Sequence, residues 1–103
     1  MKLFLVLEGE RKVWVAAVVG QDVYTYVDNT GHFHVNEAIG DDYFGEGALE
    51  YRPIGVSEAR EMIAAHVGHL DEHKRARPLA EWRDDPDPVA PDTILAMASA
   101  DQH

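Results

Sequence analysis

The first half of the chain has the hydrophobic pattern of consecutive β-strands. The first two apolar runs are apolar on both faces, as expected of central strands that are covered on each side. Turn-like sequences at 9–11 and 29–31 predict antiparallel pairing of the runs that they join. A later run contains Pro53, which cannot donate a backbone hydrogen bond, so this strand should lie at a sheet edge or end at Pro53. The five runs are residues 2–9, 12–19, 22–28, 32–35 and 48–55.

After residue 57 the apolar residues take on helical spacing. Ser57 is a favourable N-cap, and Glu58 suits the first turn of a helix. Pro78 would stop such a helix, so we expect one long helix over residues 58–76. Its core-facing stripe would consist of Ala59, Met62, Ile63, Val67 and Leu70. The predicted fold class is therefore α+β: an antiparallel meander of four to five strands, followed by one long helix packed on the sheet.

The remainder of the chain, residues 78–103, reads as an acidic tail. Four of the five prolines lie within residues 78–92, so we place the end of the α+β domain, residues 1–77, before this tail. Residues 92–100 have the spacing of a short helix, which would be too short to persist alone in water. We therefore expect this helix to dock on an apolar surface of its own sheet, of a second copy or of a partner.

The charge of the chain limits its partners. The formal net charge is −10, and a domain this acidic repels phosphate backbones, so we expect no direct binding of nucleic acid. A basic partner would suit it. The apolar runs are too short to span a membrane, and the first residues lack the features of a signal peptide. The absence of cysteine excludes disulfides and thiolate zinc sites. We expect a cytoplasmic protein without a membrane partner.

Six histidines are the main candidates for chemistry. On the predicted helix, His66, His69 and His73 would lie within about 60° of one another. His32 and His34 would share one face of a strand and could add ligands. Such a cluster could bind zinc or another divalent metal, respond to pH, or simply pack at the edge of the core. Apart from this metal, we expect no cofactor.

Residues 69–73, with the sequence HLDEH, resemble the motif of inverted zinc proteases, in which two histidines bind zinc and a glutamate acts as general base. The resemblance covers five residues and implies a third ligand, a glutamate on a helix far downstream. Glu81 is the only glutamate that follows the motif, and it lies in the proline-rich segment. We therefore predict no catalytic residues and expect that the protein is not an enzyme.

The composition favours a protein-interaction module such as an inhibitor, an antitoxin-like or immunity-like partner, or an accessory subunit. Its partner would be another protein or a second copy of the chain. The alternative is a histidine-based metal-binding protein or a small metal-dependent enzyme. Aromatic residues on one strand face and apolar residues of the short tail helix are the candidates for partner contact. They are Tyr24, Tyr26, Ile94, Leu95 and Met97.

Overall fold

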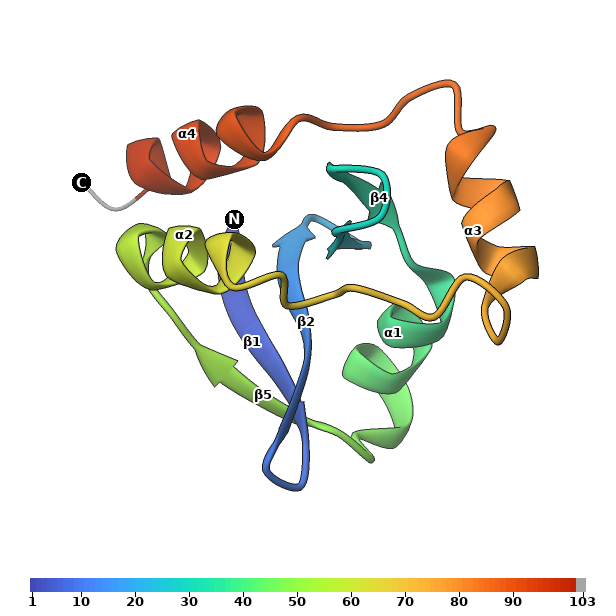
Figure 1. Cartoon of the computed structure of the whole chain (residues 1–103). Helices are drawn as coiled ribbons and strands as arrows, with labels where there is room; N and C mark the ends of the chain where they lie inside the picture. Colours follow the sequence, from blue (N-terminus) through green and yellow to red (C-terminus); the bar gives the residue numbers. More distant parts are fainter. Residues whose placement is uncertain (102–103) are drawn as a thin grey trace.

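The computed structural model describes residues 1–101, which fold around a five-stranded antiparallel sheet (Figure 1). The spatial order of the strands is β4-β3-β2-β1-β5, so the first four form a meander and β5 returns to pair with β1. Their bounds are β1 (Lys2–Glu8), β2 (Arg11–Val19), β3 (Asp22–Val27), β4 (His32–Val35) and β5 (Glu50–Pro53). The predicted α+β class and antiparallel sheet are confirmed, and Pro53 lies on an edge strand.

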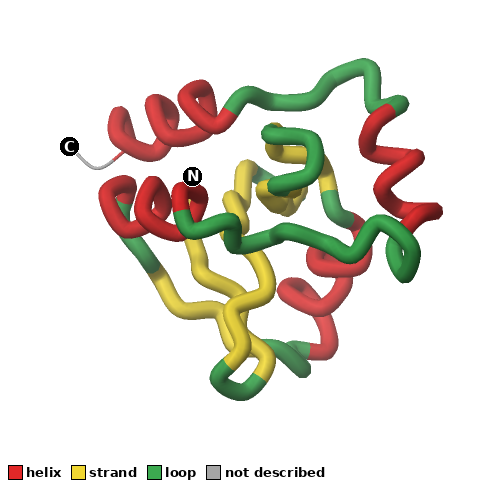
Figure 2. The backbone as a smooth tube through the Cα atoms, in the orientation of Figure 1, coloured by secondary structure: helices red, strands yellow, loops and turns green. Residues whose placement is uncertain are grey.

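Helices cover both faces of this sheet. On one face, Leu5 of β1 and Val15 of β2 pack with α2 and α4; on the other, Val6 and Val18 pack with Ile39 of α1 and Leu79 of α3. This two-sided cover explains why β1 and β2 are apolar at nearly every position. Figure 2 shows α2 and α4 side by side, with α1 and α3 at the other end of the molecule. The bounds are α1 (Glu37–Asp41), η1, a π-helical turn (Asp42–Glu46), α2 (Val56–Ala64), α3 (Ala76–Arg83) and α4 (Pro91–Asp101).

The prediction of one long helix over residues 58–76 is wrong. The first helix, α2, ends at Ala64, and the chain then takes left-handed backbone angles at His66 (φ 63°) and Gly68 (φ 96°). Val67 packs in the core on one face of the sheet, whereas Leu70 packs against the core on the other face. A single straight helix cannot bury both, so the segment leaves the helix and passes the end of β3, where Asp28 N–H donates to the Gly68 carbonyl at 3.3 Å.

The C-terminal segment contains α3, a short bridge to the sheet, and α4. Phe33 of β4 and Val89 exchange two backbone hydrogen bonds, at 2.8 and 2.9 Å. On α4, Ile94 and Leu95 are buried in the same core as Phe33. We call residues 84–90, which run from α3 past the edge of β4 to α4, the strap.

The docking of α4 in solution can be tested by hydrogen exchange. Backbone amides of residues 94–98 should be protected, because Ile94 and Leu95 anchor the helix and a free helix of this length would fray. Changing both residues to serine should remove this protection. The matched control is Met97→Ser, on the exposed side of α4, which should leave it in place. Exchange at unfolded-chain rates in the wild type would contradict the prediction.

Candidate binding groove

His34 of β4 binds the strap through its side chain, which lies on the face of the sheet opposite to the side chain of Phe33. Its side chain is buried, and its Nδ1 donates to the Asp85 carboxylate at 2.8 Å. Its Nε2 lies 2.7 Å from the Thr30 hydroxyl, and its ring stacks on Trp82 with the centroids 6.2 Å apart. The hydrogen bond from His34 lowers the pKa of Asp85, as expected for a donor to the charged form. Strand, strap and α3 therefore meet at one buried imidazole.

The order hydroxyl, imidazole, carboxylate is also the connectivity of a nucleophilic triad. Such a triad needs backbone N–H groups free to stabilise an oxyanion. Next to Thr30, however, the N–H of Gly31 donates to the Val27 carbonyl, and the N–H of His32 donates to the Thr30 hydroxyl itself. Because these neighbouring donors are already engaged, the arrangement supports a positional role for His34 better than a hydrolytic one.

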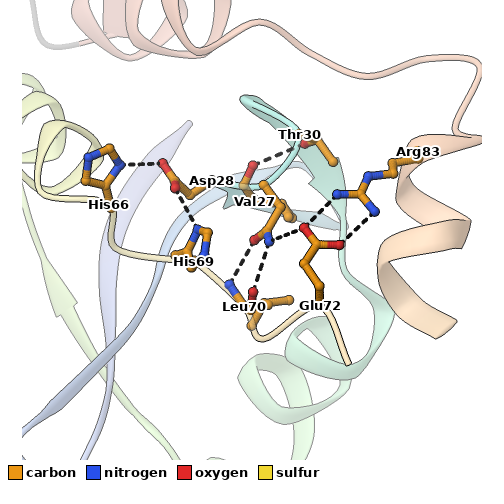
Figure 3. A network of polar contacts seen from close by, with 9 residues as sticks. Val27, Asp28, Thr30, His66, His69, Leu70, Glu72 and Arg83 are labelled. Carbon is orange, nitrogen blue, oxygen red and sulfur yellow. Dashed lines mark hydrogen bonds and ion pairs between the residues drawn. The ribbon is translucent and has the colours of Figure 1, made fainter. Parts of the chain in front are cut away.

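A second polar cluster holds the segment after α2 (Figure 3). The two oxygens of the Asp28 carboxylate accept from Nδ1 of His66 and Nδ1 of His69, each at 3.0 Å. The side chain of Asn29 accepts from the Leu70 N–H at 2.8 Å and donates to the Leu70 carbonyl at 2.9 Å. The turn between β3 and β4 thus fixes the path of residues 66–70.

The same cluster continues to α3 through Glu72. Arg83 donates to both oxygens of the Glu72 carboxylate, at 2.9 and 2.7 Å, and Asn29 donates to one of them at 2.9 Å. These bonds lower the pKa of Glu72 to about 2. This exposed glutamate, which occupies the general-base position of the HLDEH pattern, therefore forms a fork-shaped ion pair with Arg83 of α3.

The structure separates the histidines of the predicted cluster, and three of the five contact two different carboxylates. His66 and His69 meet at Asp28 instead of lining a helix, and His34 meets Asp85. His73 donates from its backbone N–H to Asp71, and His32 Nδ1 lies 2.9 Å from the Thr30 carbonyl oxygen. Among the side chains of residues 1–100, no group of three or more histidines or carboxylates has a geometry suited to a metal ion. Metal binding by these histidines stays a prediction, but the shared helix face on which it was based does not form.

Acid denaturation tests the role of Asp28. Burial raises the pKa of Asp28, but the hydrogen bonds and charges of His66 and His69 outweigh it and bring the pKa below its usual value. A carboxyl group with a lowered folded-state pKa stabilises the fold above its unfolded pKa, and this contribution is lost as the pH falls through the folded value. Asp28→Asn should therefore be less stable than the wild type at neutral pH, and the gap should begin to close below about pH 4.

The measurement is the urea midpoint of the wild type and Asp28→Asn at several pH values. Asp22→Asn, at an exposed carboxylate at the start of β3, is the matched control and should follow the wild-type curve. A stability gap that does not change with pH would contradict the assignment.

An open groove of about 940 Å³ lies between α1, α3 and the sheet. Its aromatic residues are Trp14, Tyr24 and Trp82, and the two tryptophan rings meet edge to face at 5.9 Å. α1 is held beside it by Asn36, whose side chain accepts from the Ile39 N–H at the start of the helix. The charged residues that line it are the acidic Glu37, Glu81, Asp84, Asp85 and Asp87 and the basic Arg11 and Arg75. The groove thus combines aromatic surface with an excess of negative charge.

The residues predicted for partner contact lie in different places. Tyr24 lines the groove, and Met97 is 40% exposed on α4. Tyr26, Ile94 and Leu95 are buried in the core of this chain. Trp14 and Trp82 were not predicted as site residues, because the groove exists only when α3 folds back onto the sheet. Leu79 and Trp82, three residues apart, were the available signal for that helix.

No protein-family model, curated protein or solved structure gives a significant match to this chain. None of the helices within residues 1–101 has the length and apolar character needed to cross a membrane.

Proposed function

We propose that this protein is a small acidic protein-interaction module that binds a partner protein through the groove between α1 and α3. An inhibitor, an antitoxin-like or immunity-like partner, and an accessory subunit are the roles that fit such a module. The observation that carries the proposal is the groove itself, which is lined by five carboxylates and by the tryptophan pair. Aromatic side chains in a concave surface are frequent sources of binding energy between proteins.

The charge of the groove supports a basic protein as its partner. Five carboxylates and two guanidinium groups line it, in a chain whose formal net charge is −10. Such a surface attracts cationic side chains and speeds their association, and it disfavours phosphate backbones. Trp82 is positioned for this contact because His34 and Trp14 hold its ring from two sides. A fixed aromatic side chain loses little conformational entropy when a partner binds.

Charge reversal at the groove tests the proposal. A partner would first be co-purified with the wild type from native lysate, identified, and prepared in pure form for titration. Glu81→Lys/Asp84→Lys changes two exposed carboxylates of the groove and should weaken binding at least about tenfold, as expected for losing attraction and adding repulsion. The matched control, Glu10→Lys/Glu61→Lys, changes the net charge equally at exposed positions outside the groove and should bind like the wild type.

Equal binding by both double variants would place the partner elsewhere on the molecule. Failure to obtain any partner whose purified form binds the wild type would remove the support for an interaction module. Circular dichroism and urea unfolding of each variant would establish that the fold is intact.

A further inference from the structure

The outer face of α3 is uncovered. Leu79 and Trp82 face the sheet, where Leu79 is fully buried and Trp82 packs against the core. Arg77, Ala80 and Asp84 are exposed, and at about 100° per residue they lie within about 60° of one another on the opposite side of the helix. Figure 1 shows α3 at the right-hand edge of the molecule. We call these three exposed residues the outer stripe, which is free to contact another molecule.

The charges at the two ends of α3 are opposite and lie against the helix dipole. Residues 74–77, at the start of the helix, carry three cationic side chains and no carboxylate, and residues 84–87, which follow its last turn, carry three carboxylates and no cation. Both placements are unfavourable, because the macrodipole is positive at the start of a helix and negative at its end. Arg83, the basic residue of the last turn, is already paired with Glu72. The charge pattern therefore does not serve the stability of α3 itself.

The charges of the outer stripe lack partners within the chain. The side chains of Lys74, Arg77 and Asp84 form no ion pair in the part of the chain that the structure describes. The backbone that carries them is nevertheless fixed, since the Asp71 carboxylate accepts from the Lys74 N–H at 3.0 Å and the Asp84 N–H donates to the Ala80 carbonyl at 3.1 Å. Such a face is complementary to a surface that carries the same charges in the reverse order.

The same helix in a second copy of the chain, turned end to end, is such a surface. We infer that two copies associate through their outer stripes, with the two α3 helices antiparallel. Arg77 lies three residues before Ala80, and Asp84 lies three residues after Glu81. A two-fold axis between Ala80 and Glu81 therefore brings Arg77 of each copy against Asp84 of the other, at two equivalent contacts. The small side chain of Ala80 allows the helices to approach closely at this axis.

This dimer goes beyond the proposed function, because its contacts lie beside the groove and not inside it. Arg77 and Ala80 do not line the groove, and Asp84 is the residue of the outer stripe that does. The groove is formed within one chain, so each copy keeps its own. The dimer therefore offers two grooves to a partner, related by the same two-fold axis.

The formal net charge of −10 opposes this association only weakly in physiological salt. At about 0.15 M ionic strength, charges more than about 8 Å apart are largely screened, whereas charges in direct contact are screened much less. Exposed ion pairs are individually weak and the outer stripe is small, so the dimer should be weak as well. We expect a dissociation constant on the order of 10–100 µM, and dissociation in about 1 M salt.

Charge exchange between the two ends of α3 tests this arrangement. Arg77→Glu places two carboxylates at each contact, and Asp84→Lys places two cations there, so each variant alone should associate at least about tenfold more weakly than the wild type. An equimolar mixture of the two variants should recover wild-type association, since each contact then holds one cation and one carboxylate. Both substitutions agree with the helix macrodipole, so α3 should stay folded, which circular dichroism checks.

Sedimentation velocity of the purified chains over a range of concentrations gives the dissociation constants. The matched controls are Lys12→Glu and Glu10→Lys, which make the same charge changes at exposed positions in or next to the turn between β1 and β2, away from α3. Each control should associate like the wild type. Controls that weaken association as much as Arg77→Glu does would show that the contact does not use α3, and would overturn the inference.

Two further results would also overturn it: a wild type that stays monomeric up to about 0.5 mM, and a mixture that associates no better than its two components. The proposed function is judged separately, because Arg77 does not line the groove. A groove-bound partner should bind Arg77→Glu like the wild type and Glu81→Lys/Asp84→Lys more weakly. If the wild type is monomeric and this partner result is obtained, the dimer fails and the proposed function stands.

Discussion

Replacing Phe33 with alanine should lower the free energy of unfolding by about 3–5 kcal/mol, the range found when a fully buried phenylalanine is truncated. Phe33 is 0% exposed and packs against the neighbouring ring of Tyr26, with the centroids 5.6 Å apart. Its backbone holds Val89 of the strap, and its side chain lies in the core that includes Ile94 and Leu95. The cavity would therefore lie where the sheet meets the C-terminal segment.

Urea unfolding measures this loss as a shift of the midpoint at unchanged slope. Val35→Ala is the matched control, because Val35 lies on the same strand but is 41% exposed, and it should cost less than about 0.5 kcal/mol. A Phe33→Ala protein that loses less than about 1 kcal/mol would show that the C-terminal segment does not pack on the sheet as described.

Replacing Gly68 with alanine should have the second large effect. Gly68 has φ 96°, a conformation that costs a non-glycine residue about 1–3 kcal/mol. A Cβ atom at this position would also overlap the carbonyl oxygen of Tyr26, a backbone atom that cannot move without disturbing β3. The expected loss of unfolding free energy is therefore at least about 2 kcal/mol, and more if the segment after α2 separates from the sheet.

The control for this substitution is Gly45→Ala. Gly45 lies in the π-helical turn, its φ is not positive, and a Cβ atom there would point into open space, with no contact within 4 Å. Alanine at this position should be neutral or should stabilise the fold by up to about 1 kcal/mol, since it reduces the freedom of the unfolded chain. If both glycine variants behave alike, the close approach of Gly68 to β3 is contradicted.

The sheet could be predicted from the sequence because strands that are buried on both faces have apolar residues at successive positions. Residues of β1 and β2 are apolar at successive positions, and Pro53 marks the edge strand. This pattern depends only on neighbouring positions, so one amino-acid sequence is enough to predict the strands.

The path after α2 could not be predicted in the same way. Val67 and Leu70 fit a helical stripe, yet Val67 is buried on one face of the sheet and Leu70 is partly buried on the other, and only the three-dimensional arrangement separates them. Glycine is unfavourable inside a helix, but the close contact of Gly68 with Tyr26 depends on a residue 42 positions earlier in the chain. The spacing of apolar residues alone does not distinguish a helix from an irregular segment whose apolar residues pack into the cores on both faces of the sheet.

The candidate site was missed for a related reason. His34 and Asp85 are 51 residues apart, and Trp14 and Trp82 are 68 residues apart in the sequence. Each of these residues has an ordinary local sequence, and the groove appears only when α3 packs against the sheet. The proline-rich composition after residue 78 predicted an irregular tail instead of α3, although Leu79 of this helix is fully buried.

The bridge between Phe33 and Val89 limits how this sheet can associate with others. Exposed strand edges can template the growth of a sheet from molecule to molecule. In the described part of the chain, the strap pairs with β4 at one edge, while β5 pairs only with β1 and leaves its outer side open at the other edge. Two copies joined through β5 would present only their β4 edges, where Val89 already takes both outward backbone hydrogen bonds of Phe33, so pairing of this kind favours a closed dimer over a growing fibre.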